Sequence, residues 1–286
     1  MSIRSILRHS LLSSLLLVPF AGMAAPAAPA APAASVIRIG INDSPQNAAI
    51  EVAVERAAAE GLRVELISFS DWNTPNIALA NGDIDVNYFQ HQPFLENANA
   101  QNGFDLVPLA YGVENRVGLY SNRVTSFDQV KDGDSVAVAD DPVNQGRGLH
   151  LFEQAGLISL RSDAGPKASL QDITANPRHL KFIELPGPQL ARVLDDVVIA
   201  QSYPSHMLAA GKDPNNALLF SQNAPGDHLY ALRFVVARQN IDNPGIKRFI
   251  AIFQNDPQVR AAIAEAYGNP RLYALGWLDP AQEVAR

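Results

Sequence analysis

A strand, a helix and a second strand follow one another at the start of the folded part of the chain. Residues 35–42 alternate in polarity and are rich in β-branched side chains, as in a strand. Residues 46–61 place apolar side chains at helical spacing and end at Gly61, a typical helix C-cap. Residues 62–70 have the pattern of a second strand. Strands joined through a helix pair in parallel with a right-handed crossover, so the sequence predicts an α/β fold.

The same alternation continues along the chain. We expect further helices over 74–83, 91–103, 149–157, 187–196, 244–255 and 257–267. We expect further strands over 84–89, 104–113, 116–121, 135–140, 180–185, 197–201 and 228–238.

Two of these strands are expected to pass between lobes. The strand at 116–121 leaves the first lobe, and the strand at 228–238 returns to it. The predicted organisation is a clamshell whose first lobe comprises 36–117 plus 229–286 and whose second comprises 118–228. Ligands in such folds bind in the cleft at the carboxyl ends of the strands.

The N-terminal segment has the composition of a targeting signal. Arg4 and Arg8 precede an apolar run over 11–20, followed by small residues near Ala24. This pattern predicts a secretory signal peptide over 1–24, because the apolar run is shorter than the roughly 18 residues of a membrane-spanning helix. Residues 25–35 form a linker of alanine and proline.

Composition narrows the classes of function. The net charge is −7 with a sequence pI near 5.3, which argues against a nucleic-acid-binding surface. The chain has no cysteine, so it lacks the residue for a disulfide, a thiolate zinc site or a lipid anchor. We therefore expect a soluble periplasmic protein after cleavage of the signal peptide.

A predicted loop at the start of the second lobe carries the first candidate site residues. Asn144 and Arg147 lie between the end of the strand at 135–140 and the start of the helix at 149–157. Helix N-termini attract anions, and a guanidinium binds a carboxylate with two parallel hydrogen bonds. Arg147 is the predicted carboxylate receptor; the alternative is an ordinary ion pair with Asp140 or Asp141.

Aromatic residues gather at the ends of two predicted strands. Trp72 follows the strand at 62–70, and Tyr88, Phe89 and His91 lie at the end of the next strand. Aromatic side chains around one cleft form an apolar wall with polar tips, so we predict that they contact a ligand. Core packing is the alternative, and it is the favoured interpretation for Phe94.

Signatures of catalysis are missing. The remaining histidines show no metal-ligand spacing, and there is no G-x-S-x-G or glycine-rich phosphate loop. We expect no enzyme activity, no metal and no cofactor.

Three longer stretches, 71–110, 141–160 and 176–197, resemble the NlpA/MetQ family; "NYFQH" and "DPVNQGRGLHLFEQAGLI" are its most specific motifs here. The resemblance implies the periplasmic-binding-protein fold, a type II-like clamshell. It implies a substrate-binding protein that closes over methionine or a related small amino acid or carboxylate. The expected partners are the permease and ATPase of an ABC importer, and the expected state is a monomer.

The resemblance also assigns roles to residues. It implies that Trp72, Phe89 and His91 contact the ligand side chain, that Arg147 holds the α-carboxylate and that Asn144 supports it. Two departures affect the amino-acid head group. Tyr203 and Ser205 stand in a segment where the family has asparagines.

The second departure is Arg233, which aligns with a family asparagine. A second cation facing the cleft would repel an α-ammonium group. The ligand alternatives are therefore a sulfonate, a dipeptide or another anion. The alternative function is a periplasmic lyase or dehydratase of the same fold, with His91 or His206 as general base.

Overall fold

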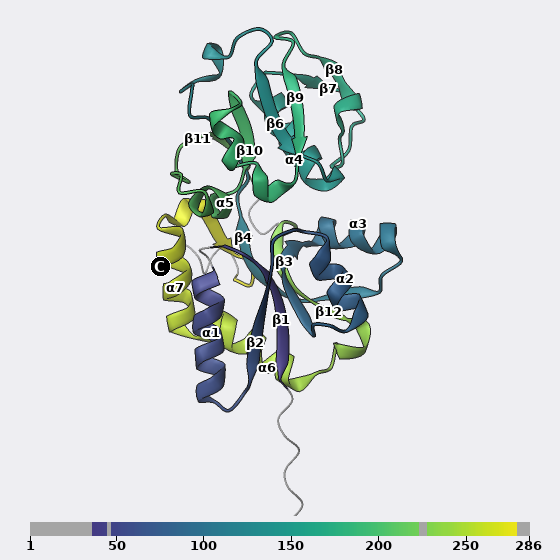
Figure 1. Ribbon diagram of the computed structural model, residues 1–286, viewed down its shortest axis with the longest axis vertical. Coiled ribbons are helices and arrows are strands. Elements are labelled where there is room, and N and C mark those ends of the chain that lie inside the picture. Colours follow the sequence, from purple (N-terminus) through teal and green to yellow (C-terminus); the bar gives the residue numbers. More distant parts are fainter. Residues whose placement is uncertain (1–35, 45–46, 223–227, 279–286) are drawn as a thin grey trace, which may run out of the picture. The chain divides into compact units, whose positions relative to one another are not determined.

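The computed structural model describes residues 36–44, 47–222 and 228–278 (Figure 1). The predicted signal peptide and linker lie outside the described residues. Two main β-sheets and a short two-stranded sheet form the framework. No helix in the described ranges has the length and apolar character needed to cross a membrane.

The first sheet has the strand order β13-β4-β12-β3-β1-β2. Its strands are β1 (Ile37–Asn42), β2 (Val64–Phe69), β3 (Val86–His91), β4 (Leu106–Asn115), β12 (Ala231–Ala237) and β13 (Tyr273–Leu275). β1 pairs in parallel with β2 and β3, which confirms the predicted strand–helix–strand unit. β12 runs antiparallel between β3 and β4, so the segment predicted at 228–238 does return to the first sheet.

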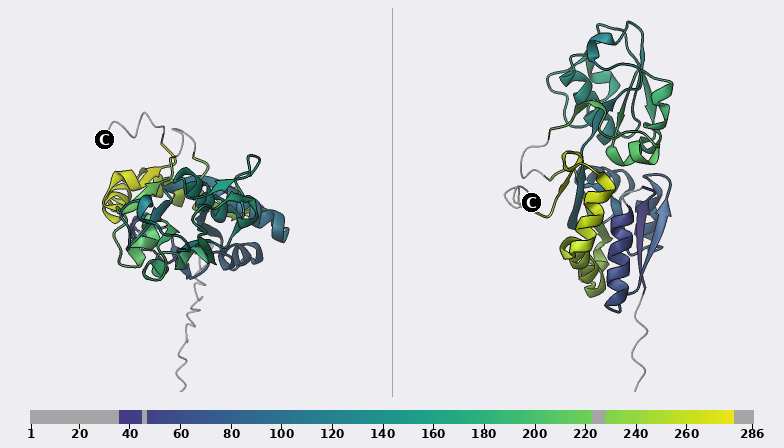
Figure 2. Two further views of the ribbon diagram at one scale, coloured as in Figure 1. Left: turned by 90° about the horizontal axis from the view of Figure 1, so that it is seen from above. Right: turned by 90° about the vertical axis from the view of Figure 1, so that its left-hand side faces the viewer.

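Helices cover both faces of this sheet (Figure 1). One face carries α1 (Asn47–Ala59), α6 (Pro244–Asn255) and α7 (Pro257–Tyr267), and the other carries α2 (Thr74–Asn81) and α3 (Gln92–Asn102). Figure 2 shows α1 beside α7, where Ile50 and Ile263 belong to the same buried cluster. The bounds of α6 and α7 agree with the prediction because Asn243 and Asp256 cap helices that begin with proline.

The second sheet has the order β11-β5-β10-β6-β9. Its strands are β5 (Gly118–Tyr120), β6 (Ser135–Ala139), β9 (Lys181–Leu185), β10 (Ile199–Ser202) and β11 (Ala217–Phe220). The remaining elements are α4 (Pro142–Gln154), α5 (Pro204–Ala209), the hairpin β7 (Ser159–Leu160) and β8 (Ile173–Ala175), and the 3₁₀ turns η1 (Phe127–Gln129), η2 (Leu170–Asp172), η3 (Gly187–Gln189), η4 (Arg192–Asp195), η5 (Arg238–Asn240) and η6 (Pro270–Leu272). The division into two lobes at the predicted residues stays a prediction.

Two helix predictions in this half were wrong. The segment 187–196 forms the 3₁₀ turns η3 and η4, since Pro186 and Pro188 flank Gly187 and remove backbone donors. The predicted loop over 141–148 is the first part of α4, which begins at Pro142.

Asp141 and two glycines explain the early start of α4. The Asp141 carboxylate accepts a hydrogen bond from the Asn144 N–H at 2.9 Å and so caps the helix. Gly146 and Gly148 let the helix lie close to its neighbours, because a Cβ at 146 would lie 2.2 Å from the Pro166 carbonyl oxygen and one at 148 would lie 2.2 Å from Gln201 Oε1. Asn144 and Arg147 therefore lie on a capped helix and not on a loop.

Buried amides connect α2 to β3. Asn76 Nδ2 donates to Gln90 Oε1 at 2.9 Å, and Gln90 Nε2 donates to Asn76 Oδ1 at 2.5 Å and to Asn87 Oδ1 at 2.9 Å. Asn87 Nδ2 completes the network with a 2.9 Å bond to Asn76 Oδ1. Buried polar groups are costly unless paired, so this network fixes the strand that carries Phe89 and His91.

We expect Gln90→Ala to lower the free energy of unfolding by about 2–4 kcal/mol, because it leaves Asn76 and Asn87 with unpaired buried groups and a cavity. Urea unfolding measures the change. Gln101→Ala, on the exposed side of α3, is the matched control and should change stability by less than about 0.5 kcal/mol. Equal effects of the two substitutions would contradict a structural role for the network.

Candidate functional site

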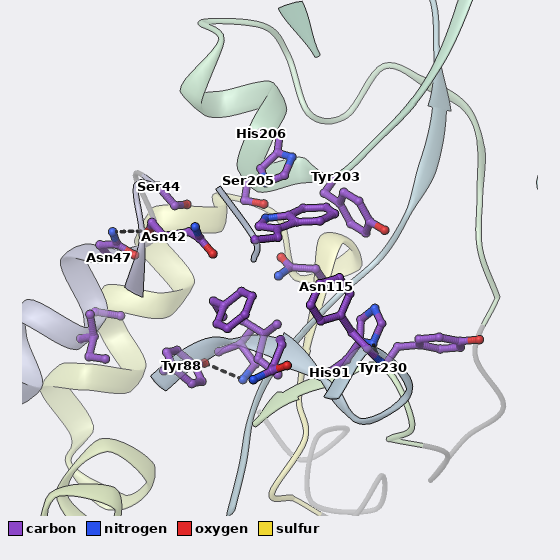
Figure 3. A pocket seen from close by; sticks show the side chains of 18 of the residues that line it. Asn42, Ser44, Asn47, Tyr88, His91, Asn115, Tyr203, Ser205, His206 and Tyr230 are labelled. Atoms are coloured by element: carbon purple, nitrogen blue, oxygen red, sulfur yellow. Dashed lines mark hydrogen bonds between the residues drawn. The ribbon is translucent and has the colours of Figure 1, made fainter. Parts of the chain in front are cut away.

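A pocket opens where strands of the first sheet end, and residues of α4 and around the start of α5 complete its walls (Figure 3). The volume inside the pocket that no atom occupies is about 980 Å³, and part of this volume is open to solvent. Most of the predicted site residues line this pocket: Trp72, Tyr88, Phe89, His91, Asn144, Arg147, Tyr203 and Ser205.

Arg147 is a buried cation on α4, with only 7% of its surface exposed. Its guanidinium carbon lies 3.9 Å from the ring centre of Tyr230 and 5.5 Å from that of Tyr203. Nη1 is 3.5 Å from the Tyr203 hydroxyl oxygen, and Nη2 is buried without a hydrogen-bond partner. Within the described ranges Arg147 forms no ion pair, so the alternative pairing with Asp140 or Asp141 does not occur.

The Asn144 side chain links the groups around Arg147. Its Oδ1 accepts the Tyr203 hydroxyl proton at 2.6 Å and lies 3.1 Å from His91 Nε2. His91 Nδ1 accepts the Phe94 N–H at 3.3 Å, so in a neutral ring the proton is on Nε2 and is donated to Asn144. Asn144 Nδ2 in turn donates to the Asp141 carboxylate at 3.0 Å.

The groups in this network are neutral apart from the guanidinium and Asp141. Burial, together with the nearby charge of Arg147, lowers the pKa of His91 to about 3. Burial raises the pKa of Tyr203 to about 12, although Arg147 opposes the shift. Burial also raises the pKa of Asp141, against the opposing hydrogen bonds from Asn144. The pocket therefore presents a positive charge on a largely neutral wall.

Trp72 forms the apolar wall together with other aromatic rings. Its ring centre lies 6.1 Å from that of Phe94, 6.2 Å from Tyr203 and 5.6 Å from His206. Gly187 makes room for the indole, because a Cβ there would lie 2.0 Å from Trp72 Cη2. His206 Nδ1 donates to the Gly187 carbonyl at 3.2 Å and holds this edge in place.

Two of the aromatic residues considered above, Tyr88 and Phe94, line the pocket and also pack within the protein. The Tyr88 hydroxyl accepts the Val113 N–H at 2.9 Å and its ring stacks on Phe234 at 4.4 Å, so Tyr88 lines the pocket as part of the core. Phe94, for which core packing was favoured, is 9% exposed and lines the pocket as well.

Arg233 does not line the pocket, contrary to our expectation that it faces the site. Its guanidinium stacks over Tyr111 at 3.9 Å and donates to the carbonyls of Ala231 at 2.6 Å and His228 at 2.9 Å. The pairing of β12 with its neighbours is irregular at this residue, and Leu232 lines the pocket instead. Burial lowers the pKa of Arg233.

Sequence reasoning missed three of the lining residues that we use below: Asn42, Tyr230 and Leu232. It considered His206, which also lines the pocket, as a possible general base. Asn42 ends β1, so the rule that ligands bind at strand ends was the available signal. Its Oδ1 is buried without a hydrogen-bond partner in the part of the chain that the structure describes. The positions of Tyr230 and Leu232 in the pocket wall depend on the irregular pairing of β12, which no sequence pattern revealed. Among the described residues no His, Asp or Glu side chains are grouped as a metal site would require.

We expect His91 to make stability depend on pH. The unfolded chain protonates this histidine below pH 6.5, whereas the folded chain does so only near 3, so stability falls as pH drops through this window. The expected slope is about 1.4 kcal/mol per pH unit between pH 6 and 4. Denaturant titrations at several pH values should show a shallower loss in His91→Gln, and no such change in the half-exposed control His150→Gln.

We expect Gly187→Ala to displace the Trp72 indole, because the new methyl group overlaps the ring. In a Trp277→Phe background the fluorescence reports Trp72 alone. The emission maximum should move to longer wavelength as the ring becomes more exposed. Gly165→Ala is the control, since a Cβ there meets nothing within 4 Å. An unchanged spectrum in Gly187→Ala would contradict the tight contact.

Comparisons with known proteins support a relationship over most of the chain. A family model described as NlpA lipoprotein matches residues 37–274. The D-methionine-binding lipoprotein MetQ of Salmonella typhimurium is 37% identical over 229 residues, which cover 79% of this chain and 84% of that protein.

Solved structures agree. The crystal structure of the methionine-binding protein MetQ has a TM-score of 0.80 and 33% identity, covering 85% of this chain and 99% of that one. A nutrient-binding protein from Burkholderia cenocepacia bound to methionine has a TM-score of 0.78 and 32% identity, covering 84% and 99%. The chain therefore belongs to the NlpA lipoprotein family and has the α/β fold of its periplasmic substrate-binding proteins.

Proposed function

We propose that this protein is the substrate-binding component of an ABC importer and that it binds methionine or a related small carboxylate. The observation that carries the proposal is the buried guanidinium of Arg147, whose Nη2 has no partner in the described ranges. An uncompensated buried charge is costly, and an anionic ligand would remove that cost. Aromatic rings beside it offer an apolar wall for the rest of the ligand.

The arrangement suits a carboxylate in particular. A guanidinium donates two parallel hydrogen bonds to the two oxygens of a carboxylate. The rings of Tyr203 and Tyr230 lie against the guanidinium and restrict its orientation. Trp72 and Phe89 then contact the ligand side chain, the roles that the family resemblance assigns to these positions.

Relatives support the ligand class. The proteins compared above include a D-methionine-binding lipoprotein and a nutrient-binding protein bound to methionine. We propose that the lobes at 36–117 plus 229–286 and at 118–228 close over the ligand, since both contribute residues to the pocket. The closed form would then be recognised by a permease and ATPase complex.

Location and assembly belong to the same proposal. The named relatives include lipoproteins, whereas this chain has no cysteine to carry a lipid. We propose a soluble periplasmic protein that acts as a monomer.

Binding fits the site better than catalysis. A general base works best with a pKa near the working pH, but the pKa of His91 is about 3 and that of His206 is lowered to about 4 by burial. Both ring nitrogens of His91 are engaged by Phe94 and Asn144. A lyase or dehydratase using either histidine is therefore disfavoured.

We expect Arg147→Met to abolish binding of small carboxylates while keeping the free protein at least as stable, because it removes a buried unpaired charge with little change in volume. Isothermal titration over a panel of amino acids and carboxylates, with thermal melts of the free protein, measures both effects. Arg271→Met, at an exposed position outside the pocket, is the matched control and should bind normally. Full affinity in Arg147→Met would contradict the assignment of the anion site.

A further inference from the structure

The groups around Arg147 receive an anion but offer no adequate partner for an ammonium group next to it. We infer that the preferred ligand is a monoanion that carries no ammonium group on the atom beside its carboxylate. This inference rests on the proposed function and specifies the ligand class of the same site.

The acceptors close to Arg147 are already occupied. Asn144 Oδ1 has two lone pairs, which receive protons from Tyr203 at 2.6 Å and from His91 at 3.1 Å. The Tyr203 oxygen has given its own proton to Asn144 and faces Arg147 Nη1 at 3.5 Å. The rest of this wall is the ring of Tyr230 and the aliphatic side chain of Leu232.

The other polar groups that line the pocket do not provide the missing acceptors for an ammonium group either. Gln90 Oε1 accepts from Asn76, and Asn115 Oδ1 accepts the Tyr267 hydroxyl at 2.5 Å. The Ser205 hydroxyl remains, and so does His206 Nε2, which carries no proton because Nδ1 donates to Gly187. These two neutral acceptors satisfy at most two of the three ammonium protons.

The strongest remaining acceptors lie elsewhere in the pocket. Asn42 Oδ1 is buried and unpaired, and Asp43 carries the one carboxylate among the described lining residues. Figure 3 shows Asn42 well separated from Tyr203 and Tyr230, the two residues against Arg147. An ammonium group attached to the α-carbon stays within a few bonds of its carboxylate and so must lie near Arg147.

The physical consequence is discrimination against free α-amino acids. The ammonium group would lose its hydration beside a like charge without gaining three acceptors, and unsatisfied buried donors reduce affinity strongly. A carboxylate with the same side chain and no amine avoids this loss.

Methionine and its deaminated analogue, 4-(methylsulfanyl)butanoate, form the matched pair of probes. Isothermal titration with the full mature chain should show that the deaminated acid binds at least roughly tenfold more tightly. Equal affinities, or tighter binding of methionine, would overturn the inference while leaving the proposed function intact. Absence of Arg147-dependent binding for both probes would instead overturn the proposed function, and the inference with it.

A second variant tests the reason for the discrimination. Tyr203→Phe removes one of the two donors to Asn144 Oδ1 and so frees an acceptor beside Arg147. The affinity ratio should shift toward methionine by roughly threefold or more. Tyr120→Phe removes a buried tyrosine hydroxyl that donates to Pro214, outside the pocket, and should leave the ratio unchanged. Equal ratios in Tyr203→Phe and the wild type would show that occupied acceptors do not set the preference.

Discussion

The carboxamide of Asn144 is the interaction on which the site depends. Its oxygen accepts from His91, at the end of β3, and from Tyr203, just before α5. Its nitrogen donates to Asp141, the residue that caps α4 and thereby positions Arg147 nearly two turns further along. Because a single buried amide joins three elements, hydrogen bonds fix the helix that carries Arg147. The rings of Tyr203 and Tyr230, and no counter-ion in the described ranges, lie against the guanidinium itself.

The arrangement leaves Arg147 with unsatisfied charge inside a neutral wall. His91 stays uncharged at physiological pH because burial and Arg147 lower its pKa to about 3. Tyr203 stays protonated because burial raises its pKa to about 12. Neither group can neutralise the guanidinium, so its charge remains available to interact with an anionic ligand.

Much of the fold was predictable from the sequence because its signals were local. The caps at Asn243 and Asp256 with their following prolines define α6 and α7, and the alternation of strand and helix predicts the parallel part of the first sheet. The start of α4 was missed because glycines at 146 and 148 indicate a loop in sequence, while in the structure they make room for neighbouring backbone and side-chain atoms.

The sequence predicted the lining residues that lie near strand ends. It did not predict the lining residues whose orientation depends on the pairing register of a strand. Arg147, Trp72, Phe89 and His91 follow from the position of their elements and all line the pocket. Arg233 and Leu232 exchange the positions that simple alternation assigns, because the pairing of β12 shifts there. The amides of β3 lie among its aromatic residues in the sequence but stabilise the fold, since Asn87 and Gln90 bind Asn76.

The most direct test of this account is a crystal structure of the protein purified without denaturation, with whatever ligand it retains. The account predicts an anionic group of the ligand within hydrogen-bonding distance of Arg147 Nη2, with its apolar part against Trp72 and Phe89. A ligand whose charged group lies at Asn42 and Asp43, with Arg147 still unpaired, would contradict it.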